Sequence, residues 1–176
     1  MFFFLFGFAA ALAILIVACS LLFAIGKFNQ LVTSRQRIAT EMLQLDLTLR
    51  KQSAALQALG RSLSTDLVSK LALAEEKSHR AVSGHLNGDN LAMLFQASDL
   101  VVYCWESANM IELDAAGRDS ENYLERTWAI RKRINRLIDD YRYFLRVGPS
   151  CALARIFGFD PLFLENSLPN ITHKVS

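Results

Sequence analysis

The sequence predicts an all-α protein in which a single N-terminal transmembrane helix is followed by an up-and-down four-helix bundle and a short C-terminal helix. The first observation is an uncharged apolar run from Phe2 to Ile25. The second is a shortage of helix breakers, because 176 residues contain 8 Gly and 3 Pro. The third is the helical spacing of apolar residues beyond the run. We divide the chain into a transmembrane anchor (1–26), a helical bundle (27–166) and a flexible tail (167–176).

The apolar run is long enough to cross a membrane. Its 24 residues would form a helix of about 36 Å, and the hydrocarbon core of a bilayer is about 30 Å thick. A cleaved signal peptide would have basic residues before a shorter apolar core, and the opening segment MFFFLFGF carries no Lys or Arg. We therefore interpret the run as an uncleaved anchor.

The charges on either side of the anchor predict its orientation. Nothing basic precedes it except the terminal amine, whereas five basic residues follow it, namely Lys27, Arg35, Arg37, Arg50 and Lys51. Basic residues are concentrated on the cytoplasmic side of a membrane. The expectation is a single-pass protein of the inner (plasma) membrane whose helical domain lies in the cytoplasm.

An alternative stays open at Cys19. The segment Ile16-Val17-Ala18-Cys19 has the form of a bacterial lipobox, in which a small residue precedes the cysteine. If this segment were processed, Cys19 would carry the lipid and the domain would lie in the periplasm. The continued apolar sequence after Cys19 and the uncharged N-terminus favour the transmembrane anchor instead.

The first helix of the bundle is predicted from about Phe28 to Leu63, and it could be continuous with the anchor. Steps of three, four and seven place its apolar residues on one stripe. These residues are Leu31, Ile38, Met42, Leu45, Leu49, Leu56, Leu59 and Leu63. Gly60 weakens the helix, and the segment Ser64-Thr65-Asp66 offers capping side chains for the start of the next one.

The second and third helices are predicted over 66–86 and 91–113, separated by the turn Asn87-Gly88-Asp89-Asn90. Each carries an apolar stripe at helical spacing. The expected core residues are Leu67, Leu71, Ala74 and Val82 in the second helix, and Leu91, Leu94, Phe95, Val101, Val102 and Trp105 in the third.

The fourth helix is predicted over 120–146, after a loop at 115–119, and it should end at Gly148-Pro149. Ser150 can cap a short final helix. The expected core residues of the fourth helix are Tyr123, Thr127, Ile130, Ile134, Leu137, Tyr141 and Phe144.

Short connections between four amphipathic helices favour an up-and-down bundle. Its first and fourth helices would be antiparallel, so that residues whose numbers add up to about 177 lie opposite each other. We therefore predict a salt link between Asp46 and Arg131 or a close neighbour, with Arg35 beside Arg142 or Asp139. Breaking one side of a partly buried pair would cost about 3–5 kcal/mol.

No motif predicts catalysis or a cofactor. Glu75 and His79 share a helix face, but no further ligand completes a metal site. The three cysteines form no CxxC pair, and neither a GxSxG nor a phosphate-binding glycine motif is present. We expect no catalytic, cofactor-binding or metal-binding residues, and we keep an unrecognised enzyme as a remote alternative.

Nucleic-acid binding is also not indicated. The densest basic run, Arg131 to Arg136, is followed by Asp139 and Asp140 and has no aromatic stacking platform beside it. The net charge of +2 gives no strong attraction to phosphates. A mixed-charge helix face is the better interpretation of the run.

Two blocks of sequence resemble the LemA family of bacterial membrane-anchored proteins. The segment FNQLVTSRQRIATEMLQLDLTLRK is similar to the family pattern YNxLVxxRxxV followed by QIDVQLKR. The segment AIRKRINRLIDDYRYFLRVGPSCALARIFGFDPLFLE is similar to ARxxYNxxVxxYN, then PS, then AxxxGF. The matching residues are Asn29, Leu31, Val32, Arg35, Gln44, Asp46 and Leu49 in the first block, and Arg131, Asn135, Tyr141, Pro149, Ser150, Ala154, Gly158 and Phe159 in the second.

The departures from the pattern mark a divergent member. Where the family continues with a DLIPNLV-like segment, this chain has AALQALG, so no proline bends the first helix. The two YN pairs of the second block are Ile134-Asn135 and Tyr141-Arg142. Family roles that depend on the missing residues do not carry over.

The resemblance implies a cytoplasmic helical domain on one N-terminal anchor. It also suggests, as a partner class, the membrane zinc metalloproteases of the HtpX type. We expect a non-enzymatic protein that binds or organises other membrane proteins and that could self-associate. The matching polar residues Asn29, Arg35 and Asp46 are expected to find partners inside the bundle.

Overall fold

A computed structural model describes residues 2–58, 64–112, 117–146 and 149–159 of the chain. These residues form five helices, and no strand occurs among them. The predicted all-α class and the long apolar N-terminal helix are confirmed. The stretch 160–166 assigned to the bundle and the tail 167–176 lie outside the described residues.

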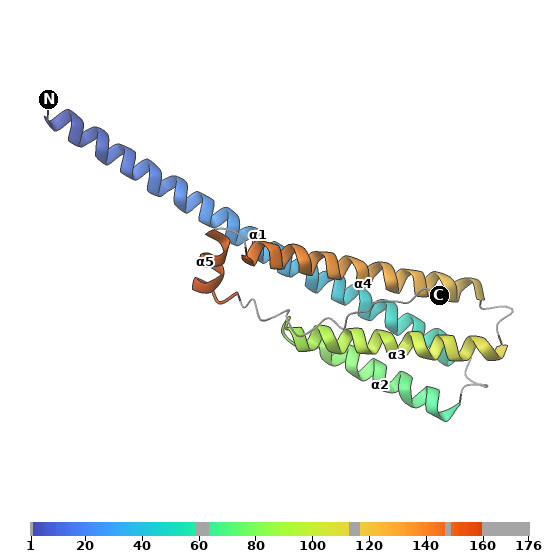
Figure 1. Ribbon diagram of the computed structural model, residues 1–176. Coiled ribbons are helices and arrows are strands. Elements are labelled where there is room, and N and C mark those ends of the chain that lie inside the picture. The colour runs from blue at the N-terminus through green and yellow to red at the C-terminus, as the bar shows by residue number, and fades with distance from the viewer. Residues whose placement is uncertain (1, 59–63, 113–116, 147–148, 160–176) are drawn as a thin grey trace.

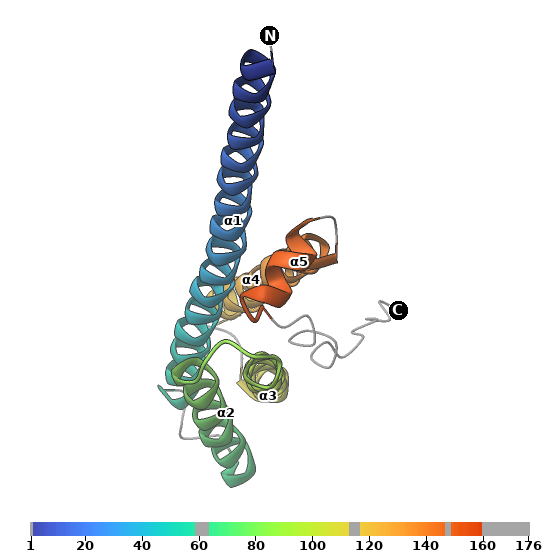
Figure 2. The ribbon, with the colours of Figure 1, turned by 90° about the vertical axis from the view of Figure 1, so that its left-hand side faces the viewer.

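Helix α1 (Phe2–Ala58) is one unbroken helix of 57 residues. Its first half projects alone from the rest of the protein, and its second half packs against the other helices (Figures 1 and 2). From Ala11 to Ile25 nearly every side chain is exposed, whereas Leu31 is the first fully buried one. Within the described residues, α1 is the helix long and apolar enough to cross a membrane.

Helices α2 (Thr65–Ser83) and α3 (Gly88–Glu112) start at side-chain caps. The Ser64 hydroxyl accepts a hydrogen bond from the Leu67 backbone N–H at 3.3 Å, as the sequence predicted. The Asn87 side chain accepts one from the Asn90 N–H at 2.7 Å, and this cap starts α3 three residues earlier than expected. Helix α2 ends at Ser83, before the extended Gly84, and is therefore shorter than predicted.

Helix α4 (Gly117–Arg146) begins inside the segment expected to be a loop and ends at the predicted residue. Helix α5 (Pro149–Ile156) is the short final helix. Proline suits the first position of a helix, since the N–H that it lacks would have no partner there. Helix α5 contacts both α1 and the end of α4 (Figure 1).

The packed helices form two antiparallel pairs. The second half of α1 runs along α4, where Glu41 meets Arg133 and Gln52 meets Thr127. Helix α2 runs along α3, and α1 also contacts both of them, while the contact between α3 and α4 is much less extensive. Both α1–α4 contacts lie close to the predicted register.

The core contains most of the residues that the apolar stripes predicted. In α1 the buried set includes Leu31, Ile38, Met42, Leu45, Leu49 and Leu56, while the expected Leu59 and Leu63 lie outside the described residues. Trp105, Phe95 and Tyr141 are the largest fully buried side chains. Of the other expected residues, Val82, Val102, Tyr123, Leu137 and Phe144 are only half-buried.

Candidate functional site

The two sequence blocks that resemble the LemA pattern meet where α1 leaves its apolar half. The ring of Phe28 lies 5.7 Å from the ring of Phe159, and the Arg35 guanidinium lies 5.8 Å from the same ring. Leu31 is buried and Val32 is half-buried beside this contact. The arrangement joins the start of the packed part of α1 to the segment that follows α5.

Gly158 allows the chain to turn so that Phe159 can reach Phe28 and Arg35 of α1. Its φ of +67° lies in the left-handed region that side chains other than glycine rarely adopt. The chain reverses there, and the Phe159 N–H donates to the Ala154 carbonyl at 2.8 Å. Phe159 is thereby returned to the core, where it is buried.

Asp46 is buried and faces α2. Its carboxylate accepts a hydrogen bond from the Ser78 hydroxyl at 2.5 Å and pairs with Arg50, one turn further along α1, at 3.0 Å. The predicted salt link between Asp46 and Arg131 is therefore wrong. The register of α1 against α4 is close to the expected one, but Arg131 lies on the side of α4 that faces α3.

Arg131 is the most buried cation among the described residues of the packed helices. Its guanidinium donates to the Asp99 carboxylate of α3 and to the Ser98 hydroxyl at 3.2 Å. The rings of Phe95 and Trp128 lie 5.0 Å and 5.1 Å from it. Arg131 thus joins α4 to α3 through a charge pair, a hydrogen bond and the cation–π contact with Phe95, and it also contacts Trp128 of its own helix.

The remaining motif residues lie in different environments. Asn29 and Gln44 are exposed. Among the described residues Asn29 has no hydrogen-bond partner inside the bundle, contrary to the expectation. Tyr141 is buried, and Asn135 is half-buried with its side-chain oxygen lacking a hydrogen bond. Pro149 begins α5. The motif residues therefore do not form one cluster.

A second buried polar contact, Gln52 with Thr127, was missed from the sequence. The Gln52 amide donates to the Thr127 hydroxyl at 2.9 Å, and both side chains are fully buried. Gln52 occupies a position of the apolar stripe between Leu49 and Leu56, and that break in the stripe is the signal that could have revealed it. Together with Asp46, Ser78, Ser98 and Arg131, the two residues make up a buried polar set whose contacts join different pairs of helices.

Replacing Thr127 by Val should destabilise the packed helices by about 1–2 kcal/mol, because the buried Gln52 amide would lose its acceptor. Urea unfolding of the full-length protein in detergent micelles, followed by circular dichroism, measures the change. Thr40→Val is the matched control, since the exposed Thr40 hydroxyl donates only to a carbonyl of its own helix. An equal loss in both variants would contradict a role for the Gln52 contact.

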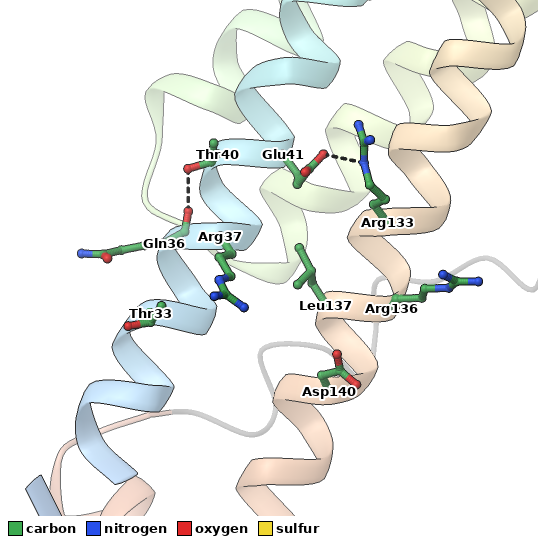
Figure 3. A pocket seen from close by; sticks show the side chains of 9 residues that line it. All are labelled: Thr33, Gln36, Arg37, Thr40, Glu41, Arg133, Arg136, Leu137 and Asp140. Carbon is green, nitrogen blue, oxygen red and sulfur yellow. Dashed lines mark hydrogen bonds and ion pairs between the residues drawn. The ribbon is translucent and has the colours of Figure 1, made fainter. Parts of the chain in front are cut away.

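A groove of about 480 Å³ runs between α1 and α4 (Figure 3). The ion pair between Glu41 and Arg133, at 3.2 Å, closes one end of it. Its lining residues are mostly exposed, and all but Leu137 are polar or charged, with both signs of charge present. Most of the wall's surface is nevertheless made by the apolar atoms of these side chains. The groove is lined by Thr33, Gln36, Arg37, Thr40, Glu41, Arg133, Arg136, Leu137 and Asp140. This mixture suits contact with a polar protein segment better than capture of one small anion.

A catalytic or metal site would require titratable side chains gathered in one place. No group of three or more His, Cys, Asp or Glu side chains could hold a metal among the described residues. Glu75 accepts a hydrogen bond from Gln57 of α1 at 3.2 Å. Burial raises the pKa of the Cys104 thiol, and the positive charge of nearby Lys70 partly offsets this increase. A protonated buried thiol is a poor nucleophile.

Cys104 should react with a maleimide only when the protein unfolds, because it is fully buried and its raised pKa keeps it protonated. Its modification should be slower than in the urea-denatured chain by about two orders of magnitude or more. Mass spectrometry after timed labelling distinguishes it from the exposed Cys19 and the half-buried Cys151. Rapid modification of Cys104 in the folded protein would show that α3 opens locally.

No protein-family model matches this sequence, and no curated protein or solved structure matches it. The likeness to the LemA pattern therefore rests on the two blocks of residues.

Proposed function

We propose that this protein is a non-enzymatic, membrane-anchored helical bundle that binds or organises other membrane proteins, itself included. The observation that carries the proposal is the unbroken course of α1 from an exposed apolar half into a packed half. A helix without a break transmits the position of a membrane span directly to the helices packed on it. That is the architecture of an anchored scaffold.

We further propose that α2, α3, α4 and the second half of α1 act as an up-and-down four-helix bundle of the LemA type. The antiparallel pairing of α1 with α4 and of α2 with α3 supports this assignment. The contact of Phe28 and Arg35 with Phe159 also supports it, because it brings the two similar sequence blocks together. The basic residues after the span favour an inner-membrane protein with a cytoplasmic bundle.

The groove between α1 and α4 is the surface that we propose for the partner. It begins at Thr33, two residues beyond the first buried residue of α1 and about two turns beyond Ile25, so a partner in the same membrane could reach it. Its exposed Arg37 and Arg136 and its Asp140 offer charge-assisted hydrogen bonds to a polar segment. An HtpX-type membrane metalloprotease, or a second copy of this chain, is the partner class proposed.

Photocrosslinking in intact membranes tests this function. A benzophenone amino acid at Gln36, which lines the groove, should capture a membrane protein or a second copy that mass spectrometry identifies. The same group at the exposed Val68 of α2, on the opposite end of the packed helices, is the matched control. Charge reversal by Arg136→Glu should weaken the product at Gln36.

Products that are equal at the two positions, or no product at Gln36, would contradict the proposal. The lipoprotein alternative has its own test, because Cys19 is a free and exposed thiol in α1. Incorporation of a labelled fatty acid that is lost in Cys19→Ser would establish it. An intact Met1 in the mature protein would exclude it.

A further inference from the structure

We propose that α5 and the adjoining Phe157 lie in the interfacial layer of the bilayer that α1 crosses, in contact with anionic lipid headgroups. The inference rests on the proposed membrane anchoring of α1. It gives the protein a second membrane contact, which would restrict rotation of the packed helices about α1. The occupant of this surface is the lipid itself.

The position of α5 along α1 is the first observation. The Phe157 ring lies 4.9 Å from the ring of Phe28, only three residues beyond Ile25, the last residue of the apolar run. Three residues of helix correspond to about 5 Å. The headgroup region on each side of a bilayer is about 5–8 Å thick. A span that ends near Ile25 therefore places α5 at the depth of the headgroups.

The exposed apolar side chains are the second observation. Ile156 is 73% exposed, Phe157 is 56% exposed, and Tyr143 at the adjoining end of α4 is 63% exposed. Ala152 is also exposed and lies one turn before Ile156, on the same face of α5. Insertion into the interface removes such apolar area from water. Aromatic side chains with a polar tip, such as Tyr143, are favoured at that depth.

The charge at this end of the packed helices is the third observation. The described residues from 20 to 35 and from 139 to 159 carry five basic side chains and two acidic ones. One acid, Asp139, is paired with Arg142 at 3.9 Å. The basic residues are Lys27, Arg35, Arg142, Arg146 and Arg155. Such a surface is attracted to anionic headgroups.

Lipid is favoured over a second copy of the chain because the patch is continuous with the lipid-facing part of α1. The side chains of α1 are exposed up to Phe23 and Ile25, and Phe157 lies against the helix directly after them. A second copy that covered Ile156 and Phe157 would have to occupy the space beside the span as well. Lipid already fills that space if α1 crosses the bilayer.

Nitroxide accessibility in the full-length protein tests the inference. Single labels at Ile156→Cys and Ala152→Cys are placed in a Cys19→Ser, Cys151→Ser background, with the buried Cys104 retained. The protein is reconstituted into vesicles of phosphatidylcholine and phosphatidylglycerol. Collision rates with oxygen, which enriches in lipid, and with a water-soluble nickel chelate are then measured. Val68→Cys is the aqueous control and Leu15→Cys is the membrane control.

The oxygen-to-nickel collision ratio at 156 and 152 should be several-fold higher than at 68. It should fall when phosphatidylglycerol is left out of the vesicles. A ratio at 156 and 152 equal to that at 68 would overturn the inference, since the face would lie in water. Low collision rates with both probes would also overturn it, because the face would then be covered by protein, as in contact with a second copy.

The label at Leu15 separates this inference from the proposed function. If Leu15 is lipid-exposed and Ile156 is in water, the anchor stands and the contact of α5 with the membrane is wrong. If Leu15 is itself in water, the anchoring and the inference are both wrong.

Discussion

Asp99→Ala should lower the free energy of unfolding by about 2–3 kcal/mol, because it leaves the buried Arg131 guanidinium without its carboxylate. The Arg131 side chain is only 4% exposed, whereas Asp99 is 52% exposed. The loss of stability therefore arises mainly because the buried Arg131 cation has lost its paired charge, and not from the removal of Asp99 contacts. Urea unfolding of the full-length protein in detergent micelles, followed by circular dichroism, measures it.

The double variant Asp99→Ala with Arg131→Met should recover part of that loss, since a buried charge is then replaced by an apolar side chain of similar length. Asp139→Ala is the matched control, because Asp139 is exposed and paired with Arg142 of its own helix. It should cost less than about 0.5 kcal/mol. If Asp99→Ala were as mild as Asp139→Ala, the Arg131 side chain would not depend on its carboxylate partner.

Asn29→Pro should bend α1 at the point where its apolar half meets the packed helices. Proline removes the N–H that bonds to the Ile25 carbonyl and its ring clashes with that carbonyl, at a cost of about 3 kcal/mol or more. The expected result is a kink of more than about 20°. Spin labels at Leu15→Cys and Gln44→Cys, both exposed on α1, report it in lipid nanodiscs.

In the unmodified sequence the two labelled residues of a straight α1 lie about 44 Å apart, so the distance distribution should be narrow around that value. In Asn29→Pro the mean distance between the labels should decrease, or the distribution should become broader. Asn29→Ala is the control, because the exposed Asn29 side chain makes no hydrogen bond or ion pair among the described residues. A broad distribution before any substitution would show that α1 already has a joint between its two halves.

The helices and their buried faces could be predicted from the sequence because periodicity and capping are local properties. The stripe from Leu31 to Leu56 and the cap at Ser64 are examples. The antiparallel register of α1 on α4 followed from the short connections, and the pair Glu41–Arg133 lies close to it. The start of α3 differs from the predicted one because the Asn87 side chain caps the helix, and the prediction had placed Asn87 in a turn.

The partners of the buried polar residues could not be predicted in the same way. Register places two residues at the same height on neighbouring helices, but it does not determine which neighbour each side chain faces. Asp46 and Arg131 lie near the same height and face α2 and α3 respectively. Predicting that requires the relative rotation of all the packed helices, which depends on the fit of side chains such as Trp105 and Phe95.

The buried polar set within a mostly apolar core has a consequence for specificity. Each contact in it, such as Ser78 with Asp46 or Thr127 with Gln52, joins two particular helices. A sliding or rotated arrangement would leave these groups buried without partners. The buried polar set therefore favours one packing of the helices, at the cost of the stability that apolar residues would supply.

Cysteine scanning along α1 in intact membranes tests whether one continuous helix is both a membrane span and part of the packed core. Single cysteines at Leu15, Leu22, Gln36 and Gln44, all exposed in the structure, are treated with a membrane-impermeant maleimide in a Cys19→Ser background. Positions 15 and 22 should react only after detergent dissolves the membrane. Positions 36 and 44 should react once the cells are permeabilised. Reaction of position 15 or 22 in intact membranes would show that the first half of α1 does not cross the membrane.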